Sequence, residues 1–262
     1  MTLPESLARR RRIGAAFAAA QDYDRHARVQ HEVAVGLAQR IAALPLPPDA
    51  RVLEIGCGTG FLTDELVRRE VSGALLVTDL APAMIQRCRA RLGDEVGRAF
   101  RVLDGERGER PAEAPFDLIS SSLAFQWFEN LPAALARLAG WLAPGGTLAF
   151  TTLAEGTFAE WREAHAALGL ASGTPHFPSA EQLRRMAPAG FQADISVATH
   201  AEPQGSAPAF LKALKAIGAG TAAAAHQPLP PGALRQVMAR FDAGGAVATY
   251  EVAICLLRRE AA

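Results

Sequence analysis

The spacing of apolar residues along the chain changes near residue 45. Residues from about 7 to 43 have a helical pattern with a break near Gln21–Asp24, and the proline-rich segment Pro45–Asp49 ends this region. We therefore expect residues 1–45 to form an N-terminal helical cap.

Short apolar segments then alternate with longer amphipathic ones. Such alternation favours an α/β fold of parallel βαβ units with helices on both faces of one sheet. Ligands bind such sheets beyond the carboxyl ends of the strands, so functional residues should follow the strands. The expected strands are Arg51–Ile55, Ala74–Thr78, Phe100–Leu103, Phe116–Ser120 and Thr147–Thr151, and the expected helices are Phe61–Arg69, Pro82–Leu92 and Leu131–Leu142, with a turn at Pro144–Gly146.

The last third of the chain has a different organisation. Two segments with strand character, Phe191–Thr199 and Ala246–Leu257, are separated by residues 201–245. A loop of that length in a compact domain usually has a function or its own structure. Helical patterns at Ala207–Ile217 and Pro231–Phe241 predict a helical lid over 201–245, with an insertion of no function as the alternative. The core would then comprise residues 46–200 and 246–262.

Composition excludes several classes of protein. The 262 residues include 27 Lys+Arg and 27 Asp+Glu, so no net charge favours nucleic acid. The three cysteines form no CxxC pair and no metal-ligand set with the histidines. No apolar segment has the roughly 20 residues that span a bilayer. Arg9–Arg12 and Ile13–Ala20 loosely resemble an export signal, but the apolar part is short and acidic residues follow it. We expect a cytoplasmic protein with no metal and no membrane or nucleic-acid partner.

The sequence VLEIGCGTGF, residues 52–61, is the strongest functional signal. It places Gly56, Gly58 and Gly60 directly after a predicted strand, where glycine lets the backbone turn sharply and approach a ligand. A dinucleotide fingerprint needs glycine where Phe61 stands, so a nicotinamide dehydrogenase is the least expected alternative. Glu54, inside the strand, favours a cationic ligand over a pyrophosphate.

Two further acidic residues follow predicted strands. Asp79 ends the second strand, where a carboxylate can accept hydrogen bonds from ribose hydroxyls. Asp104 follows the third strand and could accept from an adenine amino group, although Asp104-Gly105 is also an ordinary turn pair. The ordered set of glycine loop and two acids is more specific than any one part.

This order resembles that of the class I S-adenosylmethionine-dependent methyltransferases over roughly residues 50 to 155. The resemblance implies a Rossmann-like sheet of seven strands with helices on both faces and S-adenosylmethionine as cofactor. It implies that the glycines flank the methionine part, Asp79 the ribose and Asp104 with Gly105 the adenine. Ser122 and Leu123 would line the methyl-transfer cleft. The full set of cofactor-binding residues implied is Glu54, Gly56, Cys57, Gly58, Gly60, Asp79, Leu80, Met84, Asp104, Gly105, Ser122 and Leu123.

Other segments narrow the resemblance. They are Ile13–Phe17 with Tyr23–Ala27, Ser121–Trp127, Phe150–Thr157 with Trp161, and Leu214–Ala219. Together they are similar to the malonyl-acyl carrier protein O-methyltransferases of biotin synthesis. The stretch from Gly218 to Pro231 departs from what this family leads us to expect.

The implied reaction places the methyl group on the free carboxylate of a malonyl thioester, carried by acyl carrier protein or by coenzyme A. Carboxyl groups titrate near pH 4, so the acceptor is already ionised and needs alignment rather than a general base. The candidates for acceptor recognition are Tyr23, Gln126, Trp127 and Lys215, each of which could instead be a packing or solvated residue.

A carrier protein is acidic, so a basic docking face is expected. Arg9–Arg12, Arg184, Arg185 and Lys212 could contribute to it. Three alternatives to this function remain at this point. One is methylation of a free dicarboxylate of the trans-aconitate type, the second is methylation of a quinone-like ring, and the third is a non-enzymatic assembly factor that keeps the fold.

Overall fold

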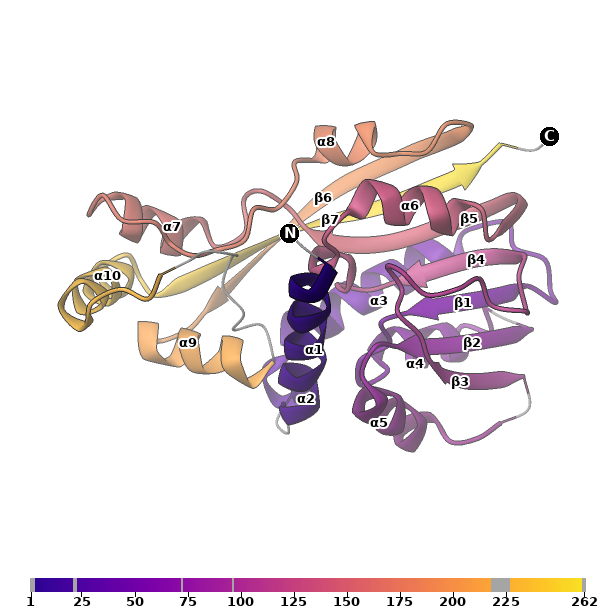
Figure 1. Cartoon of the computed structure of the whole chain (residues 1–262), viewed down its shortest axis with the longest axis horizontal. Helices are drawn as coiled ribbons and strands as arrows, with labels where there is room; N and C mark the ends of the chain where they lie inside the picture. Colours follow the sequence, from indigo (N-terminus) through magenta and orange to yellow (C-terminus); the bar gives the residue numbers. More distant parts are fainter. Residues whose placement is uncertain (1–2, 21–22, 72, 96, 218–226, 261–262) are drawn as a thin grey trace.

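The computed structural model describes residues 3–20, 23–71, 73–95, 97–217 and 227–260 (Figure 1). The helices are α1 (Leu3–Ala19), α2 (Tyr23–His26), α3 (Arg28–Ala42), α4 (Phe61–Arg68), α5 (Pro82–Leu92), the 3-10 helix η1 (Phe125–Trp127), α6 (Leu131–Ala139), α7 (Ala159–Ala166), α8 (Ala180–Arg185), α9 (Ala207–Ala216) and α10 (Pro231–Ala243). The strands are β1 (Arg51–Ile55), β2 (Ala74–Asp79), β3 (Arg98–Val102), β4 (Phe116–Ser121), β5 (Leu142–Leu153), β6 (Phe191–Pro203) and β7 (Val247–Arg259).

The strands form one seven-stranded sheet in the order β3-β2-β1-β4-β5-β7-β6. The first five are parallel, whereas β7 is antiparallel to both β5 and β6. The carboxyl ends of β1 to β4 therefore meet at one edge of the sheet, and α1 stands on that side (Figure 1). The parallel part agrees with the βαβ units that the alternation of elements predicts, and the seven strands agree with the Rossmann-like sheet that the family resemblance implies.

Apolar side chains cover both faces of the sheet. One cluster joins strand residues such as Leu53 and Ile119 to Leu135 and Leu138 of α6 and Leu183 of α8. The other joins the opposite face to residues of α3, α4 and α5. Because α3 belongs to this second layer, the predicted cap of residues 1–45 is divided, and only α1 and α2 lie over the strand ends.

A third cluster forms a separate lobe at the extended ends of β6 and β7. It joins Trp161 of α7, Phe210 of α9 and Phe241 of α10, whose rings contact one another with centroid separations of 5.3 to 5.5 Å. The predicted helices of 201–245 are thus present as α9 and α10. The lobe also includes α7, which lies outside that insertion and which the sequence pattern does not predict.

Several predicted boundaries are wrong for local reasons. The helix predicted to Leu142 ends at Ala139, and β5 begins at Leu142 rather than Thr147. Pro144–Gly146 therefore lies within β5, where the pairing with β4 shifts register after Phe116.

The sequence pattern also did not predict the helix α8. Its first turn nevertheless has a local signal, because Ser179 and Gln182 form a reciprocal N-terminal capping box.

In the part of the chain that the structure describes, no helix is long and apolar enough to cross a membrane. Within the same residues, no three His, Cys, Asp or Glu side chains are grouped as metal ligands. Of the divergent stretch 218–231, residues 218–226 lie outside the described part.

Candidate cofactor and acceptor site

The glycine loop turns from β1 into α4 with three residues in the left-handed region. Gly56, Gly58 and Gly60 have φ angles of +72°, +54° and +94°. A Cβ at Gly56 would lie 2.5 Å from the Cβ of Ala124, and one at Gly60 would lie 2.9 Å from the Sγ of Cys88. Since both conformation and space exclude a side chain, the local sequence fixes this close turn.

Asp79, at the end of β2, is held against the glycine loop. Its carboxylate accepts hydrogen bonds from the backbone N–H of Gly58 at 2.9 Å and of Ala81 at 2.8 Å. Burial raises the pKa of Asp79, and these backbone donors oppose the rise. The carboxylate thereby links the ends of β1 and β2.

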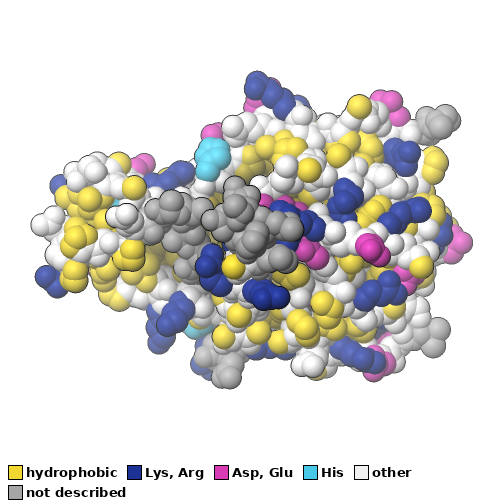
Figure 2. Space-filling view, in the orientation of Figure 1, with side chains coloured by type: hydrophobic (Ala, Val, Ile, Leu, Met, Phe, Trp, Pro, Cys, Tyr) yellow, Lys and Arg dark blue, Asp and Glu magenta, His cyan; other side chains and the backbone are white. Residues whose placement is uncertain are grey.

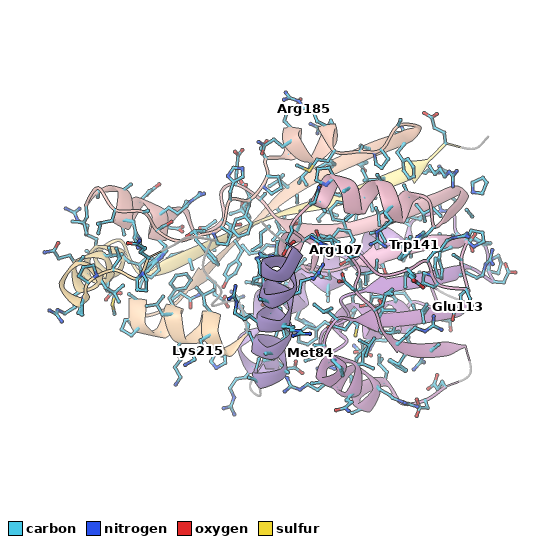
Figure 3. The ribbon with its side chains drawn as sticks, viewed as in Figure 1. Met84, Arg107, Glu113, Trp141, Arg185 and Lys215 are labelled. Atoms are coloured by element: carbon cyan, nitrogen blue, oxygen red, sulfur yellow. The ribbon has the colours of Figure 1, made fainter. Side chains whose placement is uncertain are left out.

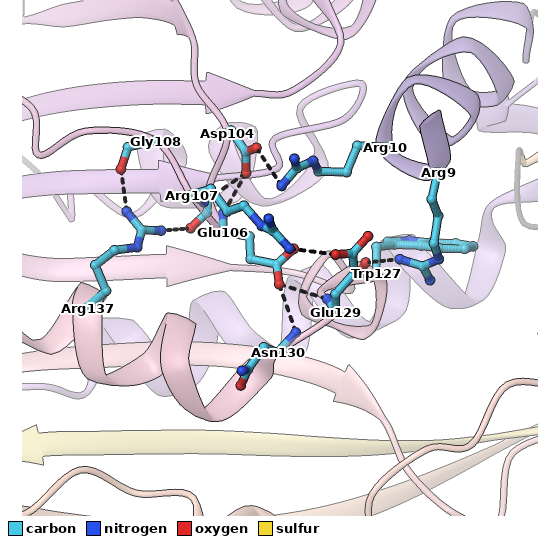
Figure 4. A network of polar contacts seen from close by, with 11 residues as sticks. Arg9, Arg10, Asp104, Glu106, Arg107, Gly108, Trp127, Glu129, Asn130 and Arg137 are labelled. Carbon is cyan, nitrogen blue, oxygen red and sulfur yellow. Dashed lines mark hydrogen bonds and ion pairs between the residues drawn. The ribbon is translucent and has the colours of Figure 1, made fainter. Parts of the chain in front are cut away.

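Asp104 lies two residues beyond β3 and organises the next turn (Figure 4). Its Oδ1 accepts from the backbone N–H of Glu106 and of Arg107, and its Oδ2 is 3.5 Å from Nη1 of Arg10 on α1. A Cβ at Gly105 would lie 2.2 Å from Cγ2 of Ile55, so this position also requires glycine.

A second layer of polar contacts supports this turn. The carboxylate of Glu106 accepts from the backbone N–H of Glu129 and of Asn130, and Arg137 donates to the carbonyl oxygen of Gly105 at 2.6 Å (Figure 4). These contacts tie the turn after β3 to the segment after η1.

Glu54 is the most unusual group in the site. It is 1% exposed, and its Oε2 has no hydrogen-bond partner in the structure. Burial raises its pKa to about 8, a hydrogen bond from Thr63 opposing this. A buried carboxylate with an unpartnered oxygen is costly unless a ligand supplies a donor or a positive charge.

A cavity at the strand ends brings these residues together under α1 and α2. Asp24 of α2 accepts a hydrogen bond from the Thr59 hydroxyl at 2.7 Å and pairs with Arg91 of α5, which fastens α2 over the glycine loop. The predicted cofactor residues that line this cavity are Glu54, Gly56, Cys57, Gly58, Asp79, Leu80, Met84, Asp104, Gly105, Ser122 and Leu123. Gly60 is outside the lining, because it faces Cys88 behind the loop.

A second cavity adjoins the first on the side of the lobe. The two share Phe17, Tyr23, Gln30, Leu123 and Trp127. The remaining lining is mainly apolar and comes from widely separated segments: Arg9, Gln126, Leu153, Phe158, Pro175, Phe177, Leu214, Ile217 and Tyr250. We call these two spaces the cofactor cavity and the acceptor cavity.

Three of the four predicted acceptor residues line the acceptor cavity. Tyr23 lies between the two cavities, and burial, with Asp79 and Asp24 nearby, raises its pKa, so its hydroxyl stays protonated. Gln126 donates to the carbonyl oxygen of Leu123 at 2.6 Å, whereas its own Oε1 is buried without a partner.

The fourth, Lys215, lies outside both linings. It is exposed on α9 and points away from the molecule, whereas Leu214 and Ile217 beside it face the acceptor cavity (Figure 3). The position of Lys215 therefore does not support the prediction that it pairs with the acceptor carboxylate.

Sequence reasoning missed several residues of the site. Arg9 lines the acceptor cavity and Arg10 lines the cofactor cavity, although both were assigned to a docking face. Phe158 and Tyr250 were not predicted at all. The signal for Phe158 is tertiary, since its ring contacts Tyr250 with centroids 4.9 Å apart.

The predicted basic face is not continuous. Arg184 and Arg185 of α8 pair with Glu181, and Arg185 lies at the opposite edge of the molecule from Lys215 of α9 (Figure 3). Figure 2 shows basic and acidic side chains interspersed over the same face. The residues of α8 and α9 therefore do not form one docking surface.

Similarity to known proteins identifies the family of this chain. A family model described as a methyltransferase domain matches residues 24–194. The malonyl-[acyl-carrier protein] O-methyltransferase of Magnetococcus marinus is 41% identical over 244 residues, which cover 92% of this chain and 90% of that protein. The chain belongs to this methyltransferase family.

Other relatives of the methyltransferase agree with this assignment. The biotin biosynthesis bifunctional protein BioCD of Bordetella avium is 45% identical over 238 residues, covering 90% of this chain. The chain spans 50% of the length of that relative. A structure of Haemonchus contortus phosphoethanolamine N-methyltransferase 2 with S-adenosylhomocysteine has a TM-score of 0.55 at 16% identity, covering 87% of this chain and 52% of that one. At this identity the likeness shows the fold alone.

These findings confirm the predicted family and fold. The chain is an S-adenosylmethionine-dependent methyltransferase with a Rossmann-like sheet. The alternatives of a nicotinamide dehydrogenase and of a non-enzymatic assembly factor are thereby set aside.

Proposed function

We propose that this methyltransferase esterifies the free carboxylate of a malonyl group carried as a thioester on acyl carrier protein, in biotin synthesis. The observation that carries the proposal is the adjacency of two chemically different cavities. One is lined by carboxylates and suits a cationic cofactor, and the other is mainly apolar and suits an acyl chain. They meet at Tyr23, Leu123 and Trp127, where a methyl group could pass between them. The names of the relatives support this acceptor.

The residues present fit S-adenosylmethionine. The unpartnered Oε2 of Glu54 is placed to accept from a positively charged donor, and the glycine loop leaves room that a Cβ would fill. We assign Gly56, Cys57, Gly58 and Met84 to the methionine part. We assign Asp79 and Leu80 to the ribose, Asp104 and Gly105 to the adenine, and Ser122 and Leu123 to the transfer path.

The chemistry requires alignment more than acid–base catalysis. Bound S-adenosylmethionine would supply an electrophilic methyl group: a lone pair of the carboxylate oxygen would form the new O–C bond, and the electron pair of the broken C–S bond would stay on sulfur. The acceptor carboxylate is ionised at neutral pH, so no base is needed. This chain's part is to position the oxygen and to exclude water, for which the aromatic walls of the acceptor cavity are suited.

We further propose that the carrier protein docks near α1 and α9. Arg11 and Arg12 on α1 and Lys212 on α9 are exposed, whereas Arg184 and Arg185 already pair with Glu181. Reversing Arg11, Arg12 and Lys212 to glutamate should weaken turnover of malonyl-carrier protein more than that of malonyl coenzyme A. The matched double variant of Arg184 and Arg185 should change turnover of neither acceptor. If the triple variant loses activity equally on both acceptors, docking near α1 and α9 is contradicted.

A cytoplasmic location also stays a prediction.

The deciding experiment follows transfer of a labelled methyl group from S-adenosylmethionine to malonyl-carrier protein, with malonyl coenzyme A and free trans-aconitate beside it. We expect labelling of the carrier-bound acyl group that mild ester hydrolysis removes. Labelling of the free acid alone would contradict the proposal and favour a dicarboxylate methyltransferase. Absence of labelling while the cofactor still binds would leave the acceptor open to other classes, quinone-like rings included.

A further inference from the structure

We propose that Arg9 of α1 binds the carboxylate of the acceptor. The inference rests on the proposed function, because it concerns the charge of that acceptor. Arg9 is the one Lys or Arg among the described residues that line the acceptor cavity, and no Asp or Glu belongs to that lining. A single positive charge in a mainly apolar space favours an anionic ligand.

The guanidinium of Arg9 is already held in place by the protein. Its Nη1 donates to the backbone carbonyl oxygen of Trp127 at 2.9 Å, on the wall that the two cavities share (Figure 4). A guanidinium has five N–H donors in a fixed plane, so this bond orients the group and leaves other donors for a ligand. The carbonyl oxygen of Trp127 carries no full charge and does not neutralise Arg9.

Three other arginines near the two cavities each lie close to a carboxylate of the protein. Arg10 lies near the carboxylate of Asp104, Arg91 pairs with Asp24 and Arg107 with Glu129. Among the side chains that the structure describes, which begin at residue 8, no carboxylate lies within ion-pair distance of Arg9. Arg9 shares with Arg137 a bond to a backbone carbonyl oxygen, but of these two only Arg9 lines the acceptor cavity, where an anionic ligand can pair with it.

This assignment also explains how the product could leave. If Arg9 donates to one oxygen of the malonyl carboxylate, the other oxygen stays free to form the bond to the methyl carbon. The ester that forms is neutral, so the ion pair with Arg9 is lost while Arg9 keeps its proton. Substrate should therefore bind more tightly than product.

The test compares a charged acceptor with a neutral one of similar shape. Dissociation constants of malonyl coenzyme A and of its methyl ester are measured by calorimetry in the presence of S-adenosylhomocysteine, which prevents turnover. Arg9→Met should weaken binding of the malonyl thioester roughly ten- to hundredfold, as expected for a hydrogen bond to a charged group, and change binding of the ester little. Arg9→Lys should restore part of the preference, since it keeps the charge without the planar donors.

Two further variants make the result specific. Lys215→Met tests the rival cation on α9, and Arg235→Met is a matched exposed arginine on α10 of the same lobe. Both should keep the wild-type preference for the charged acceptor. An Arg9→Met protein that keeps this preference, or a Lys215→Met protein that loses it, would overturn the inference.

The experiment distinguishes a wrong acceptor from a wrong role for Arg9. If the wild-type protein neither methylates nor binds any malonyl thioester, the acceptor itself is wrong. If it methylates malonyl thioesters and Arg9→Met does so with unchanged KM and kcat, the acceptor stands and the role of Arg9 is wrong. Binding of S-adenosylhomocysteine to each variant, which should stay within about twofold of wild type, shows that the fold and the cofactor cavity are intact.

Discussion

The cofactor cavity and the acceptor cavity share a wall but are built in opposite ways. The cofactor cavity draws its key groups from turns directly after parallel strands and includes the carboxylates of Glu54, Asp79 and Asp104. The acceptor cavity draws single residues from distant segments and has Arg9 as its charged group. With the ligands that we propose, this difference would direct the cationic cofactor and the anionic acceptor to neighbouring spaces by charge.

The largest expected effect is the loss of cofactor binding when the glycine loop of the cofactor cavity is altered. Gly56→Ala places a Cβ at a φ of +72°, 2.5 Å from the Cβ of Ala124. A left-handed L-residue costs about 1–2 kcal/mol, and the displacement of Ala124 adds to it, so we expect binding of S-adenosylhomocysteine to weaken about thirtyfold or more. Calorimetry measures this directly.

The control for this variant is Gly36→Ala. Gly36 lies in α3, and a Cβ there meets nothing within 4 Å. This variant should bind the cofactor product as the wild type does and be more stable by about 0.5–1 kcal/mol, since alanine favours a helix. If both variants bind equally well, the glycine loop is not constrained as described.

Glu54→Gln sharpens the charge comparison. Cation binding favours the ionised carboxylate, and the pKa of Glu54 in the free protein is about 8. Affinity of the wild type for S-adenosylmethionine should therefore rise between pH 6 and 8, by up to about tenfold per pH unit, with release of a proton. The glutamine variant should bind roughly tenfold more weakly at pH 8 and show no such rise. Calorimetry in buffers of different ionisation enthalpy counts the protons, and an uptake of protons would contradict the assignment.

Tyr23→Phe tests the boundary between the cavities. Its hydroxyl stays protonated and can only donate to an anionic acceptor, so its loss should lower kcat/KM for the malonyl acceptor roughly tenfold. Affinity for S-adenosylhomocysteine should change less than about twofold. Steady-state kinetics and calorimetry separate the two, and a loss confined to cofactor affinity would place Tyr23 on the cofactor side alone.

A separate effect concerns the stability of the protein without ligand. The pKa of Glu54 is raised in the folded protein, so from about pH 5 to pH 8 the folded chain holds a proton that the unfolded chain has released. The contribution of Glu54 to stability therefore falls as pH rises through this window. One pKa unit is linked to about 1.4 kcal/mol and 1 kcal/mol to about 2–4 °C, so we expect the melting temperature to drop on the order of 10 °C across the window, and Glu54→Gln to reduce that drop. A melting temperature equally dependent on pH in both proteins would show that other groups cause the change.

The predictability of the two cavities differs for a physical reason. Gly56, Gly58, Asp79 and Asp104 could be predicted because parallel strands bring their carboxyl ends to one edge, so residues after strands are neighbours whatever the rest of the chain does. Lys215 was a reasonable candidate by charge, but the apolar Leu214 and Ile217 beside it face the cavity. Local pattern shows that a helix is amphipathic and leaves open what its apolar face covers.

The sequence by itself determined the family, the order of elements and the cofactor loop, because these depend on short-range conformational limits such as positive φ angles and on the regular geometry of βαβ units. Tertiary structure alone decided which arginine lines which cavity. Arg9 and Arg10 are adjacent in α1, yet one reaches the carbonyl oxygen of Trp127 and the other lies near Asp104. Successive residues of a helix point about 100° apart, so their environments are set by how α1 lies across the strand ends. In the same way, α7 belongs to the lobe because Trp161 packs against Phe210 and Phe241, which are distant in sequence and close in space.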